Sequence, residues 1–170
     1  MKEEFIYTEN AGLIILRPFF TTLFEQLNLI EKNDWKFQNH DHKAVLLMHF
    51  LVYGDEFFQE DKMILNKILC GFSSDEVINT NILLSSDEKE ACEDLLKAVI
   101  KHWSVIGNSS IDSLRAMFLQ RNGKIELKNE NHELWIEGKA FDILLNQIPW
   151  GISITKTPWM EGLLFCHFNH

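Results

Sequence analysis

The sequence predicts an α+β fold, a mostly helical domain of about five to six helices with a small antiparallel β-hairpin or three-stranded sheet near the C-terminus. Apolar residues recur at three- and four-residue intervals through most of the first 121 residues, which is typical of helices packed on a core. After residue 123 they alternate with polar residues, which is typical of strands with one buried face. The helices therefore come first and the sheet follows.

The first predicted helix spans residues 11–30, AGLIILRPFFTTLFEQLNLI. Its apolar stripe consists of Leu13, Leu16, Phe20, Leu23, Phe24 and Leu27. Pro18 has no backbone N–H to donate, so it either starts the main helix or kinks a longer one that begins near Asn10. We expect a bend at Arg17 and Pro18.

A second helix is predicted over residues 41–53. Asn39 or Asp41 can cap its N-terminus, and Gly54 can adopt the left-handed conformation that ends a helix. Its apolar stripe consists of Val45, Met48 and Val52, with Leu47 and Leu51 beside it.

Two further helices are predicted over residues 61–71 and 87–103, and residues 72–84 between them lack a regular period. Gly71 ends the shorter helix. The run from Ser85 to Glu88 supplies capping oxygens and acids to the electropositive N-terminus of the longer one. Its expected buried stripe is Ala91, Leu95, Ala98, Val99 and His102, flanked by Cys92 and Leu96.

The last long helix is predicted to begin after Ser109 or Ser110 and to end at Asn122–Gly123. The period then changes to two. Residues 124–128 and 132–137 alternate around a polar turn, which predicts a β-hairpin.

An isolated hairpin is marginal in water, so this one must pack on the helices or gain a third strand. Residues 151–157 are the candidate strand, and residues 141–148 are predicted to form a short helix that leads to it. The sequence has no internal repeat, low-complexity tract or Gly/Ser linker, so we expect residues 1–170 to form a single globular domain.

Composition and charge exclude several classes of partner. The formal net charge of -9 argues against binding nucleic acid or anionic lipid, which requires Lys and Arg. No stretch approaches about 18 apolar residues, and residues 1–10 carry acids where an export signal has basic residues. The three cysteines, Cys70, Cys92 and Cys166, are far apart and surrounded by apolar residues, which suits a reducing cytoplasm. We expect a cytoplasmic protein without a membrane partner.

The histidines and cysteines do not predict a metal site. His40 and His42 open a helix, where positions i and i+2 point about 200° apart, and His49 is interpreted as a residue at the edge of the core. Only Cys or carboxylate ligands from elsewhere in the chain could complete a site. Cys92 and His102 lie about 15 Å apart along one helix, too far for a nucleophile and its base.

No phosphate-binding, nucleophile-elbow, zinc or paired-cysteine motif occurs in the sequence. Pairing of Cys70 with a distant histidine, or of two carboxylates, stays open. The hypothesis is a non-enzymatic protein with no catalytic residue, no metal, no cofactor and no small-molecule substrate.

Two aromatic segments are candidates for contact with a partner. Two Pro-Trp pairs lie nine residues apart, Pro149–Trp150 and Pro158–Trp159, and Met160 follows the second. Core packing explains such pairs, but Trp and Met are also enriched in protein interfaces. Phe57 and Phe58, in a predicted loop, are the second candidate on the same argument. The predicted partner-contact residues are Phe57, Phe58, Pro158, Trp159 and Met160.

Several longer segments, in one order along most of the chain, resemble the conserved domain of the tape-measure proteins of contractile injection systems. The resemblance depends on the combination of NAGL, LNK-LCG, LR-x-x-FLQR-x-G and the doubled PW. The positions that carry it are Asn10, Gly12, Pro18, Asn66, Gly71, Gln120, Arg121, Gly123, Pro149, Trp150, Pro158 and Trp159.

The resemblance implies a structural part of a phage-tail-like particle that contacts tube, baseplate or cap proteins and forms a homo-oligomer there. The alternative is a cargo-binding or chaperone-like adaptor of the same particle. The chain departs from the family in its length, because family members are often much longer and a tape measure must span a tube. Even as one unbroken helix, this chain would reach only about 255 Å. We therefore expect the globular end domain or a piece of a tape measure, or a short relative that acts as adaptor, plug or cap.

Overall fold

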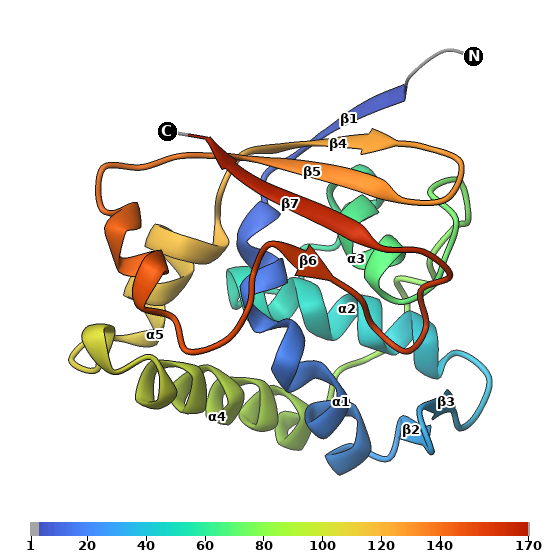
Figure 1. The fold of residues 1–170 in the computed structure, drawn as a ribbon. Helices are drawn as coiled ribbons and strands as arrows, with labels where there is room; N and C mark the ends of the chain where they lie inside the picture. The colour runs from blue at the N-terminus through green and yellow to red at the C-terminus, as the bar shows by residue number, and fades with distance from the viewer. Residues whose placement is uncertain (1–3, 170) are drawn as a thin grey trace.

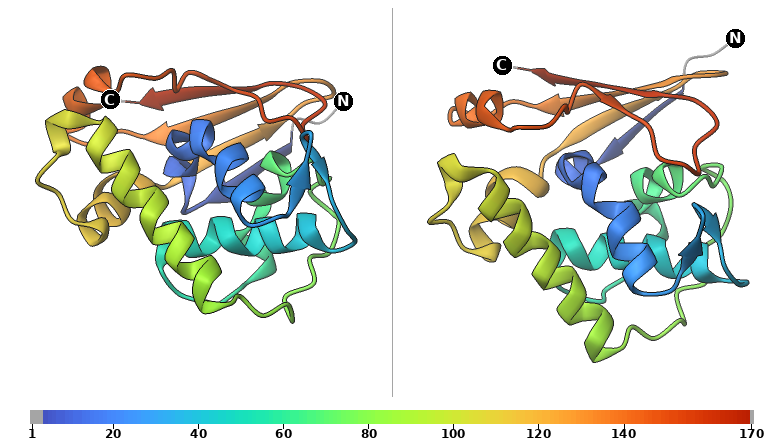
Figure 2. Two further views of the ribbon diagram at one scale, coloured as in Figure 1. Left: turned by 90° about the horizontal axis from the view of Figure 1, so that it is seen from below. Right: turned by 60° about the horizontal axis from the view of Figure 1, so that its bottom comes forward.

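A layer of helices covers one face of a five-stranded mixed sheet in the computed structural model, which describes residues 4–169 (Figure 1). Helices α1 to α5 all lie on the same side of this sheet, as the two further views show (Figure 2). Residues 1–3, part of the segment in which the sequence argues against an export signal, lie outside the described residues.

The α-helices are α1 (Arg17–Gln26), α2 (His40–Tyr53), α3 (Ile64–Leu69), α4 (Ser86–His102) and α5 (Ile111–Leu114). The 3₁₀-helices are Ala11–Leu16, Glu60–Lys62, Ser104–Ile106 and Asp142–Gln147, and a π-helical turn, Arg115–Leu119, continues α5. The strands are β1 (Glu4–Thr8), β2 (Ile30–Glu31), β3 (Asp34–Trp35), β4 (Gly123–Leu127), β5 (His132–Glu137), β6 (Ile154–Thr155) and β7 (Leu164–Asn169).

The N-terminal helical segment bends where the sequence predicts. A fully buried 3₁₀-helix covers Ala11–Leu16 and gives way at Arg17 to α1, so Pro18 lies in the first turn of the main helix. The predicted extension to residue 30 is wrong, because α1 ends at Gln26 and Asn28 adopts a left-handed conformation. The chain then forms the small β2–β3 sheet.

Helix α2 lies in the centre of the helical layer. All its residues from Ala44 to Val52 are buried, so its apolar surface extends around the whole helix and not only along the predicted stripe. Gly54 is left-handed at its C-terminus, as predicted, with φ of 71°. The prediction of a side-chain cap at the N-terminus is wrong for Asn39, which is itself left-handed and makes no capping hydrogen bond.

Helix α4 begins as the sequence predicts. Ser85 Oγ accepts a hydrogen bond from Glu88 N, and Glu88 Oε1 accepts one from Ser85 N, so the two residues form a capping box. The predicted buried stripe holds at Ala91, Leu95 and Val99. The prediction that His102 belongs to this buried stripe is wrong. Its side chain is exposed, and Trp103 is the buried residue at the end of the helix.

The predicted hairpin is present, but the sheet around it is larger than expected. Its strand order is β1-β4-β5-β7-β6. Strands β4 and β5 pair antiparallel as predicted, β1 adds antiparallel to β4, and β7 adds parallel to β5. The predicted third strand is reduced to β6, which pairs with β7 and not with the hairpin. Strands therefore come from both ends of the described chain.

The sheet buries one face and leaves the other open to solvent. Leu134 and Ile136 on β5 and Ile125 on β4 are fully buried against the helices. The alternate residues point away from the helical layer, and the register aligns four of them in one row across β1, β4, β5 and β7: Tyr7, Lys124, Trp135 and His167. Trp135 and His167 stack in this row with ring centroids 4.1 Å apart.

The capping box of α4 makes stability depend on pH. Burial raises the pKa of Glu88, but the Ser85 N–H and the Lys43 ammonium, 2.9 Å away, outweigh it, so the net pKa lies below the ordinary value of 4.5. A depressed native pKa contributes stability above about pH 4.5 that is lost as the pH falls through the native pKa. In chemical unfolding between pH 7 and 3, we expect Glu88→Gln to be less stable than the original chain at pH 7 and to approach it at pH 3.

The matched control is Glu90→Gln, since Glu90 is an exposed carboxylate on the same helix. Its stability difference from the original chain is expected to stay small and constant over the range. A Glu88→Gln difference that does not shrink on acidification would contradict the assigned role of Glu88.

Candidate functional site

The histidines that might suggest a metal site have three separate partners. His40 Nδ1 lies 3.3 Å from Leu29 O, and His42 Nδ1 accepts a hydrogen bond from Asn79 N. His49 Nε2 lies 2.7 Å from Asp55 Oδ1. Within residues 4–169, no three His, Cys, Asp or Glu side chains are grouped so that they could hold a metal ion.

The three cysteines are buried thiols. Loss of water around them raises the pKa of Cys92 to about 12, that of Cys166 to about 11 and that of Cys70 well above its ordinary value. The thiols therefore stay protonated at neutral pH, in the less nucleophilic form. Cys70 Sγ lies 3.7 Å from Met48 Sδ and Cys166 Sγ lies 3.6 Å from Thr155 Oγ1, so both thiols have neutral neighbours.

A polar network inside the fold joins three elements through two fully buried asparagines. Asn10 Nδ2 donates to Asn66 Oδ1 at 2.7 Å, and Asn66 Nδ2 donates to Val45 O at 3.1 Å. Thr8 Oγ1 in turn donates to Asn10 Oδ1. The network ties the end of β1 to α3 and α2. Both asparagines carry the family resemblance, and they act as internal ties between elements.

Three successive carbonyls near the C-terminus of α2 accept hydrogen bonds from one turn of the chain. Arg115 donates from Nη2 to Phe50 O at 3.2 Å and from Nε to Leu51 O at 3.0 Å. Gln120 Nε2 donates to Val52 O at 3.0 Å. Phe50 O also accepts the Gly54 N–H at 2.8 Å. The last carbonyls of a helix lack their full set of partners inside the helix, so these two side chains complete the C-terminal end of α2.

A buried ion pair joins the π-helical turn to the 3₁₀-helix that follows the hairpin. Arg121 and Asp142 are 1% and 3% exposed, and their side chains form two parallel hydrogen bonds of 3.0 and 2.5 Å. Arg121 Nε also donates to Met117 O, and Arg121 Nη1 donates to Glu137 O. The sequence singled out Arg121 but gave no reason to choose Asp142 as its partner.

The two Pro-Trp pairs both place an indole against the helical layer. Trp150 Nε1 donates to Ile15 O at 2.9 Å, and its ring meets Phe19 edge-on at 5.2 Å between centroids. Trp159 Nε1 donates to Asn33 O at 2.9 Å, and its ring stacks on Trp35 at 4.6 Å. Both tryptophans therefore fix the C-terminal loops to the N-terminal third of the chain.

The predicted partner-contact residues differ in exposure. Phe57 is 80% exposed, whereas Phe58 is half-buried and meets His49 edge-on at 5.2 Å. Pro158 is exposed, Trp159 is half-buried and Met160 is only 7% exposed. The structure brings the last three together in one turn but places Phe57 and Phe58 on a separate loop.

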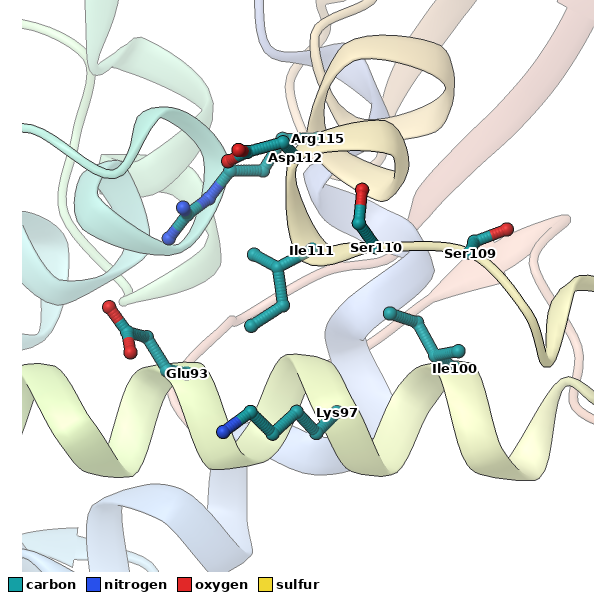
Figure 3. Close-up of a pocket in the computed structure, with 8 residues that line it drawn as sticks. All are labelled: Glu93, Lys97, Ile100, Ser109, Ser110, Ile111, Asp112 and Arg115. Carbon is teal, nitrogen blue, oxygen red and sulfur yellow. The ribbon is translucent and has the colours of Figure 1, made fainter.

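An open cleft of about 460 Å³ lies between α4 and α5 (Figure 3). It is lined by Glu93, Lys97, Ile100, Ser109, Ser110, Ile111, Asp112 and Arg115. The Arg115 guanidinium points out of this cleft toward α2, where it makes the capping bonds described above. Glu93 and Lys97 lie on the exposed face of α4. The apolar part of the cleft consists of Ile100 and Ile111, and the other residues that line it are polar.

These features define a structural α+β domain whose buried polar side chains hold its own elements together. The chain belongs to the contractile injection system tape measure protein family, whose model matches residues 1–168. It is a structural component of such a particle, since the family is a structural, non-enzymatic kind of protein. No curated protein and no solved structure matches it. None of the helices within residues 4–169 combines the length and apolar character needed to cross a membrane.

Proposed function

We propose that this chain is an assembly component that contacts tube, baseplate or cap proteins and is present in several copies in the particle. Its membership in the tape measure family and the use of its buried polar groups within the fold both support this role. Such a component acts through its shape and its exposed surface, so the exposed aromatic side chains are the candidate contacts.

The short helices support a role at one place in the particle and not the role of a chain that spans the tube and sets its length. The longest helix among residues 4–169, α4, has 17 residues and measures about 25 Å. The helices fold back on one sheet instead of continuing one another (Figure 1). We propose an end domain, adaptor, plug or cap of the tube.

The observation that carries this proposal is an exposed phenylalanine on an ordered loop. Asp55 Oδ1 accepts hydrogen bonds from Phe57 N at 3.1 Å and contacts His49 Nε2 at 2.7 Å. Phe58 packs on the same histidine. These contacts fix the loop while the ring of Phe57 projects into water. An aromatic anchor that is already ordered loses little conformational entropy when a partner covers it.

The turn with Pro158, Trp159 and Met160 is proposed as the second contact. Pro158 and the exposed part of Trp159 can meet a partner directly. Met160 is buried, so it would act there by holding the turn in place. Trp159 also packs on Trp35 and Phe24, so its replacement is expected to lower stability as well as binding.

Phe57→Ala is the sharper test, because it removes an exposed ring without opening a cavity. We expect its stability to stay within about 0.5 kcal/mol of the original chain. Its affinity for the tube, baseplate or cap protein that the original chain captures is expected to fall at least about thirtyfold, equivalent to about 2 kcal/mol. The measurement is co-purification after co-expression with each candidate, followed by titration of the captured one.

Leu83→Ala is the matched control, since Leu83 is 86% exposed and lies in a different loop. It should bind like the original chain. Failure of the original chain to capture any tube, baseplate or cap protein would overturn the proposal. Capture of a secreted effector in their place would favour the cargo-binding adaptor.

A further inference from the structure

Strand β1 is an open edge of the five-stranded sheet (Figure 1). It pairs with β4 on one side, and within residues 4–169 the backbone of Glu4–Thr8 makes no hydrogen bond to another element. The opposite edge, β6, is only two residues long. Natural sheets shorten or cover their edges, because an uncovered strand can pair with another chain. β1 has five residues and lacks this protection.

The side chains of β1 make this edge apolar at its centre. Phe5 is 42% exposed and Tyr7 is 77% exposed, and both lie on the outer face of the sheet. Ile6, between them, is half-buried and packs toward the core. The Lys124 ammonium of β4 lies 4.7 Å from the centre of the Phe5 ring, a cation–π contact. A strand added here would gain apolar contacts on both faces.

The sequence of β1 is complementary to itself. In an antiparallel pair with a two-fold axis at Ile6, Phe5 faces Tyr7 of the second copy and Glu4 faces Thr8. Each pair occurs twice by symmetry. Aromatic pairs directly opposite one another stabilise antiparallel strands, and within the strand Glu4–Thr8 no two like charges meet in this register. The axis would also join the outer rows of the two sheets, Tyr7–Lys124–Trp135–His167 of one copy to Phe5 of the next.

We propose that β1 is the self-association edge of this protein, through which two copies pair antiparallel about an axis at Ile6. The inference deepens the proposed assembly role and rests on it for the presence of several copies in the particle. The occupant is a second copy because the aromatic rings of Phe5 and Tyr7 face each other twice in that register. The alternative occupant is a strand of a tube or baseplate protein, and the test below distinguishes it from a second copy.

Single cysteines placed in β1 test both the contact and its register. Cys70, Cys92 and Cys166 are buried, so an introduced cysteine is the accessible thiol. Ile6→Cys is expected to form a disulfide-linked dimer under mild oxidation with oxidised glutathione. A mixture of Phe5→Cys and Tyr7→Cys should also cross-link, because these positions face each other across the axis. Tyr7→Cys alone should give no disulfide-linked dimer, since the two cysteines would lie on diagonal positions about 7–8 Å apart.

Leu83→Cys is the control for random collision, because its side chain is 86% exposed and far from β1 in sequence. The result expected is at least about tenfold more covalent dimer for Ile6→Cys and for the mixture than for this control. If both β1 designs gave no more covalent dimer than the Leu83→Cys control, the proposal would be overturned. Efficient linkage of Tyr7→Cys with itself would overturn the register.

A second variant separates loss of association from loss of fold. Tyr7→Lys places a charge opposite Phe5 of the second copy, and Tyr7 is exposed enough for the fold to tolerate it. Combined with Ile6→Cys, it should abolish cross-linking while thermal melting stays that of Ile6→Cys alone. All these measurements use the purified chain, so they can fail while capture of tube or baseplate proteins succeeds. If a strand of a captured tube or baseplate protein pairs with β1 instead, the Tyr7→Lys variant would lose the capture of that protein.

Discussion

Gly12→Ala is expected to destabilise this protein by more than about 3 kcal/mol, with a fall in melting temperature of roughly 10 °C. A β-carbon at position 12 would lie 1.7 Å from Phe118 O and 2.6 Å from Leu119 Cα. The 3₁₀-helix at Ala11–Leu16 is completely buried against this turn, and Ala11 N donates to Arg121 O at 2.9 Å. The clash involves backbone on both sides, so no side-chain rotation can relieve it.

Gly151→Ala is the matched control, because a β-carbon there meets no atom within 4 Å. Its melting temperature should equal that of the original chain. Thermal unfolding followed by circular dichroism measures both variants. If Gly12→Ala melted with Gly151→Ala, the close approach of the 3₁₀-helix to Phe118 would not exist in solution.

The helices were predictable because their signals are local. The capping box at Ser85 and Glu88, the left-handed glycine at position 54 and the start of the main helix at Pro18 follow from residues a few positions apart. Helix α2 was found as an element, but its burial on all sides depends on what packs around it. His102 fits the apolar stripe by spacing, yet the helix ends there and leaves it exposed.

The outer strands of the sheet were not predictable in the same way. β1 has five residues and β7 reads LFCHFN, so neither shows a long alternation. A short apolar run is compatible with a helix or a strand, and only long-range pairing decides between them. β7 lies parallel to β5, so no short turn connects them and no turn motif marks the pair.

The resemblance pointed to residues that tie the fold together but not to which residues pair with one another. Asn10 pairs with Asn66 across 56 positions, and Arg121 pairs with Asp142. Arg115 lies in the motif LR-x-x-FLQR-x-G, but nothing in the motif indicates that its side chain caps another helix. For the surface, the sequence indicated Phe57 but gave no reason to expect that Tyr7 and Trp135 share one open sheet face.

The Arg121–Asp142 pair gives the second large effect, since Arg121→Met is expected to cost about 3–5 kcal/mol in unfolding free energy. The substitution removes the donor to both carboxylate oxygens and to Met117 O and Glu137 O. The Asp142 carboxylate is 3% exposed, so water cannot replace those hydrogen bonds without opening the structure. Urea unfolding at pH 7 measures the loss.

The nearby exposed pair between Lys139 Nζ and Glu137 Oε1, 3.3 Å apart, provides the control. Lys139→Ala leaves the backbone N–H of Lys139, which donates to Asp142 Oδ2, in place. It should therefore cost less than about 0.5 kcal/mol, as is usual for exposed ion pairs. The comparison separates the effect of burial from that of removing a positive charge.

The double variant Arg121→Met with Asp142→Leu tests whether the two residues act as one unit. Each single substitution leaves a buried charge without its partner, but the double variant leaves none. Its loss of stability should therefore be smaller than the sum of the two single losses by about 2 kcal/mol or more. Additive losses would mean that Arg121 stabilises the fold mainly through the two carbonyls, because those hydrogen bonds disappear in Arg121→Met and in the double variant alike.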